Sequence, residues 1–446
     1  MRRRFIALAL FALLFTLGWW AGRGRASSDL YARLDTFVEI LHKIEENYVE
    51  PVEPQRLIHG AVHGMLRDLD PYAEYVAPRQ GGKTAPAASA GDVGIALGAR
   101  DGAWVVIAPD PGGPAARAGV RAGDALVQVD GRSAESWSRG ETQAALRGAP
   151  GSSVKLSVMR AGDETPREIA VTRALPGRRT PPTSDTIEHG IGLVRLQAID
   201  DSTALELKPM LRRLRGSGVT RLVLDLRGCT SGTLRAGGDV AQVFLARGQV
   251  VARSRGRGRD SEMRRLATDA APVLDWPMVV IVDRSCAGAS EVIAGALQDD
   301  DRGLLVGATT FGLAATQSDF PLEGGDSRVR LTTALQLTPS GRPIQGAARP
   351  AADEEDDSGA PDSAAADTTA RPQFSTRSGR RIPGGGGIHP DVEIAPASGA
   401  SAATLAAAES PTASADPVMR RALEVLRRAH APRDVFAALP SGTLRN

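Results

Sequence analysis

The sequence of 446 residues predicts an α/β core with a mostly parallel sheet, an inserted β-rich domain and an N-terminal helical region. Strands and helices alternate over residues 190–346, as they do around parallel sheets. The apolar run at 221–227 is typical of a strand that is buried on both faces. Residues 92–173 contain short strands separated by glycine turns, which predicts the β-rich domain.

The composition supports a folded chain and points to no cofactor. Hydrophobic residues make up 42% of the chain, and the net charge of +2 gives no case for a nucleic-acid partner. We find no metal-ligand spacing, Walker loop or dinucleotide fingerprint. We therefore expect no metal, no cofactor and no nucleic acid.

The N-terminus has the pattern of a targeting segment. Three arginines precede an uncharged apolar run at residues 5–22, which is long for the apolar segment within a signal peptide and just long enough to span a bilayer. We expect residues 1–26 to be a signal peptide or a membrane anchor, and Gly24-Arg25-Ala26 would allow cleavage. Either alternative predicts an exported, periplasmic or extracytoplasmic protein; an uncleaved segment would hold it in the inner membrane.

Residues 27–80 are predicted to form a helical region. Apolar residues recur at helical spacing over 29–48 and again over 54–69. A linker rich in Gly, Ala and Pro follows at 81–91, before the β-rich domain.

The core elements follow from short apolar runs and amphipathic stretches. The expected strands and helices alternate along the chain: strands at 191–196, 221–227 and 279–282, and helices at 203–214, 236–246 and 290–299.

Three segments carry little periodicity. Residues 253–265 hold six arginines, and we expect a solvated loop rather than a site for an anionic partner or lipid. Residues 347–380 are rich in Ala, Asp, Glu and Ser and are predicted to be a disordered insert. Residues 397–446 are predicted to be a low-complexity tail that ends in a helix over 417–439.

The stretch from Val279 to Gln317 resembles the signature of the C-terminal processing, or tail-specific, serine peptidases. Ser290-Glu291, Thr310-Phe311-Gly312 and Gln317 match that signature. The resemblance places the family's nucleophilic serine at Gly288 and its general-base lysine at Leu313. Both members of the family's Ser-Lys dyad are therefore replaced.

A third departure lies in the turn that, by the same resemblance, supplies an oxyanion donor. The family commonly has Asn-Pro-Gly-Gly in this turn after Asp-Leu-Arg, whereas this chain continues from Arg227 with Gly-Cys-Thr-Ser-Gly. Ser231 and Gly232 occupy the positions of the two glycines. Three replacements at one site argue against an alignment slip.

The resemblance extends to most of the chain. Residues 91–174 resemble a PDZ domain, and residues 175–346 with 381–396 resemble the peptidase core. PDZ domains capture protein or peptide C-termini by strand addition, with a backbone loop that receives the carboxylate. The implied peptide-binding residues are Val93, Gly94, Ile95, Ala96 and Leu97. Asp92 replaces a small residue beside this loop, and its charge would weaken capture.

The resemblance and its departures lead to two functional hypotheses. We expect an exported, catalytically inactive homologue that binds protein tails or partners. The alternative is an active endopeptidase that cleaves near protein C-termini with another nucleophile, such as Ser285, Cys286 or Ser290. We expect Ser290 to be a helix N-cap rather than a nucleophile.

The two cysteines, Cys229 and Cys286, both fall in segments of the implied site. Export would permit a disulfide between them, and the resemblance implies that their turns lie side by side. Two small buried residues, or a reactive Cys286, remain as alternatives.

Overall fold

The computed structural model describes most of the chain outside its ends and two long segments. The described residues are 34–76, 90–100, 102–135, 137–177, 180–188, 190–257, 262–267, 272–322, 327–345, 372–394 and 416–439. They belong to two compact units, Met1–Arg67 and Asp68–Asn446.

The first unit contains two helices, one over residues 34–47 and α2 over Pro54–Arg67. Within the part of the chain that the structure describes, no helix is both long and apolar enough to cross a membrane. The predicted targeting segment, 1–26, lies outside the described residues, so its role stays a prediction.

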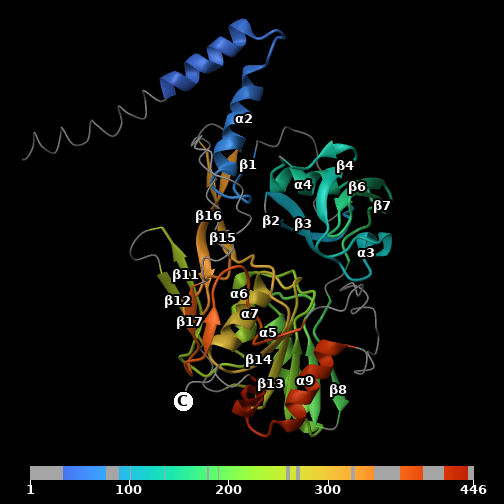
Figure 1. Ribbon diagram of the computed structural model, residues 1–446, viewed down its shortest axis with the longest axis vertical. Helices are drawn as coiled ribbons and strands as arrows, with labels where there is room; N and C mark the ends of the chain where they lie inside the picture. The colour runs from blue at the N-terminus through green and yellow to red at the C-terminus, as the bar shows by residue number, and fades with distance from the viewer. Residues whose placement is uncertain are drawn as a thin grey trace, which may run out of the picture. The chain divides into compact units, whose positions relative to one another are not determined.

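The second unit is built around a six-stranded sheet with the order β19-β14-β13-β10-β9-β8 (Figure 1). Its strands are β8 (Thr183–Glu188), β9 (Ile191–Arg195), β10 (Arg221–Asp225), β13 (Met278–Val282), β14 (Leu304–Gly307) and β19 (Val392–Glu393). All neighbouring strands pair in parallel except β8 and β9. The predicted mostly parallel sheet is thus confirmed.

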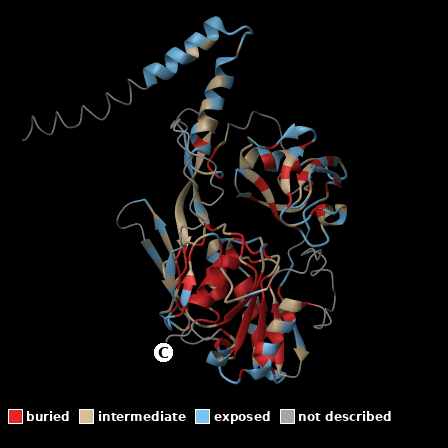
Figure 2. Ribbon diagram, in the orientation of Figure 1, coloured by how far each residue is buried: buried red, intermediate tan, exposed pale blue. Residues whose placement is uncertain are grey.

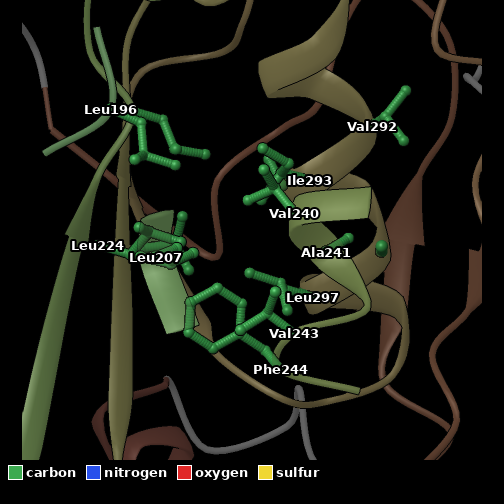
Figure 3. Packing of buried hydrophobic residues seen from close by; sticks show 14 of the residues in the cluster. Leu196, Leu207, Leu224, Val240, Ala241, Val243, Phe244, Val292, Ile293 and Leu297 are labelled. Carbon is green, nitrogen blue, oxygen red and sulfur yellow. The ribbon is translucent and has the colours of Figure 1, made fainter. Parts of the chain in front are cut away.

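Helices cover both faces of this sheet. Successive strand residues point to opposite faces, so Leu222 and Leu224 join one apolar cluster and Val223 joins the other. The first cluster includes residues of α5 (Thr203–Gly216), α6 (Leu234–Ala241) and α7 (Ala289–Asp299). Figure 3 shows side chains of α6 and α7 packed toward sheet residues such as Leu224.

The opposite face is covered by the C-terminal segment. Helix α9 (Pro417–Arg428) and the 3-10 helix η2 (Pro432–Ala438) bury Leu423, Leu426 and Phe436 in the second cluster. The predicted single helix over 417–439 is therefore interrupted. Ala429 is extended, and Pro432 supplies no backbone N–H to continue the helix.

A second sheet forms beside the core and corrects one prediction. It contains β1 (Glu74–Val76), β11 (Val250–Gly256), β12 (Glu262–Leu266), β15 (Ala315–Pro321) and β16 (Arg328–Leu337). The arginine-rich stretch at 253–265, predicted as a solvated loop, supplies the antiparallel pair β11 and β12. Backbone pairing, which charge composition does not reveal, decides the structure here.

The β-rich domain forms the sheet β2-β3-β4-β6-β7, with β5 paired to β4. Its elements are β2 (Ile95–Arg100), β3 (Ala103–Pro109), α3 (Pro114–Ala118), β4 (Ala125–Val129), β5 (Arg132–Ser133), α4 (Arg139–Leu146), β6 (Ser153–Met159) and β7 (Arg167–Thr172). Strand β2 lies at the edge of this sheet, as strand addition requires.

The end of the predicted insert is ordered, which corrects its boundary. Strand β17 (Gln373–Ser375) pairs with β18 (Arg381–Pro383), and Arg380 in the connecting turn is buried. Arg380 forms ion pairs with Asp301 (2.7 Å) and Asp391 (2.5 Å). These buried pairs fix a segment whose composition suggests disorder; residues 346–371 lie outside the described residues.

Candidate functional site

The turn between β13 and α7 brings the implied catalytic positions together. Gly288, the residue before α7, has φ 64° and ψ −109°, a conformation that favours glycine. A Cβ atom on Gly288 would lie 3.6 Å from the carbonyl oxygen of Leu313 and 4.0 Å from that of Gly232. The three positions therefore form one site, without a nucleophile at Gly288 or a base at Leu313.

Glu291 holds this site together. Its fully buried carboxylate accepts hydrogen bonds from the backbone N–H groups of Gly288 (3.0 Å), Gly312 (2.7 Å) and Leu313 (2.8 Å) and from the Thr310 hydroxyl (2.5 Å). Burial raises the pKa of Glu291 despite these bonds. This role of Glu291 was not predicted from the sequence, although a Glu three residues after a helix cap is a known capping signal.

The side chain at the base position makes apolar contacts. Leu313 packs with Phe311, Ile107 and Ala287, so an apolar cluster occupies the place implied for a lysine amine. Gln317, the last residue of the matched signature, donates a hydrogen bond to the carbonyl oxygen of Tyr72 (2.9 Å).

The two serines that flank Gly288 are buried in structural contacts. Ser290 has no exposed surface, and its hydroxyl donates to the carbonyl oxygens of Cys229 (2.8 Å) and Ala287 (3.1 Å). The prediction that Ser290 caps α7 is wrong, because the helix begins at Ala289 and Gly288 is its cap. Ser285 is only 2% exposed.

The cysteines lie on neighbouring turns but are not bonded. The Ala287 N–H donates to the Cys229 carbonyl oxygen (3.2 Å), so the expected proximity of the two turns is present. Both thiols are free and the predicted disulfide is absent, because the Cys286 thiol faces the Leu226 carbonyl oxygen (3.1 Å) and the Cys229 thiol faces that of Ser231 (3.9 Å).

Burial also makes both thiols poor nucleophiles. It raises the pKa of Cys229 to about 12 and that of Cys286 well above its usual range. Since the thiolate is the reactive form, neither cysteine is activated in this structure.

The turn after β10 keeps its position through Asp283, a residue that was not predicted to belong to the site. The partly buried Asp283 carboxylate accepts hydrogen bonds from the N–H groups of Ser285 (3.0 Å) and Gly228 (3.3 Å), and desolvation raises its pKa. Gly232 has φ 117°, and a Cβ there would lie 2.3 Å from the Ile199 carbonyl oxygen. Ser231 is exposed on the same turn.

The implied peptide-binding residues lie at the start of β2. Val93 is fully buried, and its carbonyl oxygen accepts a hydrogen bond from the Ala115 N–H (2.9 Å). Gly94 has φ 71°, and the remaining positions, 95–97, are the first residues of β2. Ile95 and Leu97 pack against the same apolar cluster as Leu146 of α4. The edge strand and this helix thus flank the implied groove.

Three family profiles match successive parts of the chain. "Activating protease CtpB N-terminal domain" matches residues 22–79, "PDZ domain" matches 105–160, and "Peptidase family S41" matches 190–351. The three matches fall in turn on the N-terminal helices, the β-rich domain and the core around the six-stranded sheet.

Individual proteins match over most of the chain. A carboxy-terminal-processing protease of Bartonella bacilliformis is 32% identical over 324 residues, covering 71% of this chain and 74% of the relative. Carboxy-terminal processing protease CtpB of Bacillus subtilis is 28% identical over 322 residues, covering 71% and 66%. Among solved structures, the photosystem II D1 C-terminal processing protease matches with TM-score 0.61 and 27% identity, covering 88% of this chain and 91% of that one.

Proposed function

Because the chain belongs to peptidase family S41, we propose that it is a member that has lost peptide hydrolysis and binds protein segments through its PDZ domain. The single observation that carries the proposal is Gly288 at the head of α7. The turn, the glutamate that braces it and the facing loop are present, while the side chain that would attack a peptide bond is missing.

Acyl transfer by this type of site needs a nucleophile and a base within hydrogen-bond reach. Gly288 and Leu313 supply neither, and Ser285, Ser290, Cys229 and Cys286 are buried. Ser290 is committed to two carbonyl oxygens, and burial keeps Cys286 protonated. These contacts favour inactivity over an endopeptidase with a substitute nucleophile.

The sequence supports export of the chain, with residues 5–22 as a signal peptide or inner-membrane anchor. The protein-binding part of the proposal is supported by the PDZ match and by the edge position of β2. A protein segment in extended conformation would add to this strand by backbone hydrogen bonds.

The test is hydrolysis of an unfolded protein with an apolar C-terminus by the purified chain. We expect no cleavage above the level of a matched preparation that carries Ser285→Ala, Cys286→Ala and Ser290→Ala together. Cleavage that disappears when one of these three residues is changed would refute the proposed inactivity. Cleavage that survives all three changes would indicate a contaminating protease.

A further inference from the structure

We infer that Asp92 determines which segments the PDZ domain accepts: its carboxylate stands in for the C-terminal carboxylate of a peptide. The groove would then take an internal extended segment of a partner rather than a free C-terminus. This inference deepens the proposed function, since it rests on peptide binding at β2.

Asp92 already occupies part of the loop that would receive a carboxylate. Its Oδ1 accepts a hydrogen bond from the Gly94 N–H (2.9 Å), one of the implied carboxylate-binding amides. The Asp92 backbone is held by two hydrogen bonds with Ala174, of 2.8 Å and 3.0 Å. Because the N–H and C=O groups of Asp92 are both held, its carboxylate stays within hydrogen-bond distance of the Gly94 N–H.

The charges around the loop disfavour a further anion. Arg147, just after α4, lies 3.5 Å from Asp92 Oδ2 and is about half exposed, so it offsets one carboxylate weakly. Asp110 is a second carboxylate, and a Cβ on Gly94 would lie 3.0 Å from its Oδ2. Burial first, and then the negative charge of Asp92, raise the pKa of Asp110.

A peptide with a free C-terminus would therefore meet an occupied amide and two carboxylates. Rejecting a ligand by like charge and occupied donors is a recognised route to specificity. An internal segment carries no terminal charge and can still pair with the edge of β2. One edge amide, that of Ala99, already donates to the Tyr72 hydroxyl (3.0 Å), so pairing is expected over Ile95 to Leu97.

The test uses the full chain and one fluorescent apolar peptide, prepared with a free C-terminal carboxylate and as the C-terminal amide. Fluorescence anisotropy gives the ratio of the two dissociation constants. For the wild type we expect a ratio within about twofold of unity. For Asp92→Gly we expect the free acid to bind about tenfold more tightly than the amide. This ratio of dissociation constants corresponds to the contribution of one hydrogen bond to a charged group.

Two further variants separate charge from occupancy. Asp92→Asn keeps an oxygen that can accept from the Gly94 N–H but removes the charge, so an intermediate ratio is expected. Asp163→Asn removes a partly exposed carboxylate of the same domain, paired with Arg167, and should leave the ratio unchanged. Circular dichroism would establish that each variant is folded.

The possible outcomes distinguish this inference from the proposed function. A wild type that prefers the free acid tenfold, or an Asp92→Gly variant with no preference, would overturn the role of Asp92 while leaving peptide binding intact. Failure of every folded variant to bind either peptide would overturn both the inference and the proposed binding function.

Discussion

At the scale of single residues, Gly288 lies in a turn that has room for a side chain but a backbone conformation that favours glycine. The turn retains a positive φ, and the atoms that a Cβ at this position would meet are 3.6 Å away or more. Space for a side chain is therefore available. The remaining cost of a side chain is backbone strain, which glycine avoids.

We predict that Gly288→Ala lowers the free energy of unfolding by about 1–3 kcal/mol, the cost of an unfavourable backbone conformation. Urea unfolding would measure the change. Gly216→Ala is the matched control, because Gly216 lies in α5 with no heavy atom within 4 Å of an added Cβ and should gain slightly. An unchanged midpoint for Gly288→Ala would mean that this turn is unstrained.

The sequence predicted that these turns meet, but not which side chains hold them together. The motif placed Gly288, Leu313 and Gly232 correctly at one location, because the order of strand, turn and helix fixes where these turns meet. Residue type predicts the cap at Ser290, and with the cap there Glu291 does not fall at the position of a capping glutamate. The difference depends on where α7 begins, and the exact first residue of a helix cannot be read from local preference.

At the scale of elements, the end of β10 is tied to the start of α9. Arg227, two residues after the end of β10, forms ion pairs with Asp225 of the strand (2.9 Å) and with Asp416, the N-cap of α9 (2.7 Å). Burial alone would raise the pKa of Asp225, but Arg227 and Arg195 outweigh it and hold the pKa below its usual range. The ion pair between Arg227 and Asp225 therefore stabilises the fold only while Asp225 is ionised.

We predict that Arg227→Met destabilises the protein by about 3–5 kcal/mol at pH 7, because two carboxylates lose a buried partner. The pKa of Asp225 is lowered in the folded state, so its ion pair stabilises the fold fully above the unfolded pKa, near 4. This stabilisation is lost as the pH falls through the folded pKa. The difference in unfolding free energy between wild type and variant should therefore shrink below about pH 4. Urea midpoints between neutral and acidic pH would measure it.

The exposed pair of Arg235 and Asp201 provides the control for this experiment. Arg235→Met should cost less than about 1 kcal/mol, as exposed ion pairs generally do. A deficit for Arg227→Met that is independent of pH would show that packing, rather than the ion pair with Asp225, explains its effect.

The elements themselves were largely predictable. Apolar runs such as Val279–Val282 identified the buried strands because composition alone marks a strand covered on both faces. Long-range partners were not predictable from sequence. The local pattern of β11 and β12 indicates a charged loop, and it does not reveal that the two strands pair. The local pattern around Asp416 indicates a tail, and it does not reveal the ion pair with Arg227.

At the scale of the whole molecule, the burial pattern in Figure 2 concentrates in the layers of the core sheet and its helices. The chain completes this core only after residues 346–371. Residues from 372 onward add β19 to the sheet, and α9 and η2 to the apolar cluster on one face. Arg342 pairs with Asp299 (3.0 Å) just before that segment, and Arg380 pairs with Asp301 and Asp391 just after it.

We predict that cutting the chain between Ala360 and Pro361 leaves the two fragments associated, because the second fragment contributes strands, helices and buried ion pairs to the first. A site for a sequence-specific protease inserted there would allow the cut. After digestion, size-exclusion chromatography should give one peak, and denaturing electrophoresis should give two bands.

Adding Arg380→Met should promote separation of the two fragments, since it leaves buried carboxylates unpaired. Arg377→Met, which removes a mostly exposed arginine of the same turn, should not. If the fragments without either substitution separate under native conditions, the segment after residue 371 does not hold the core together as proposed.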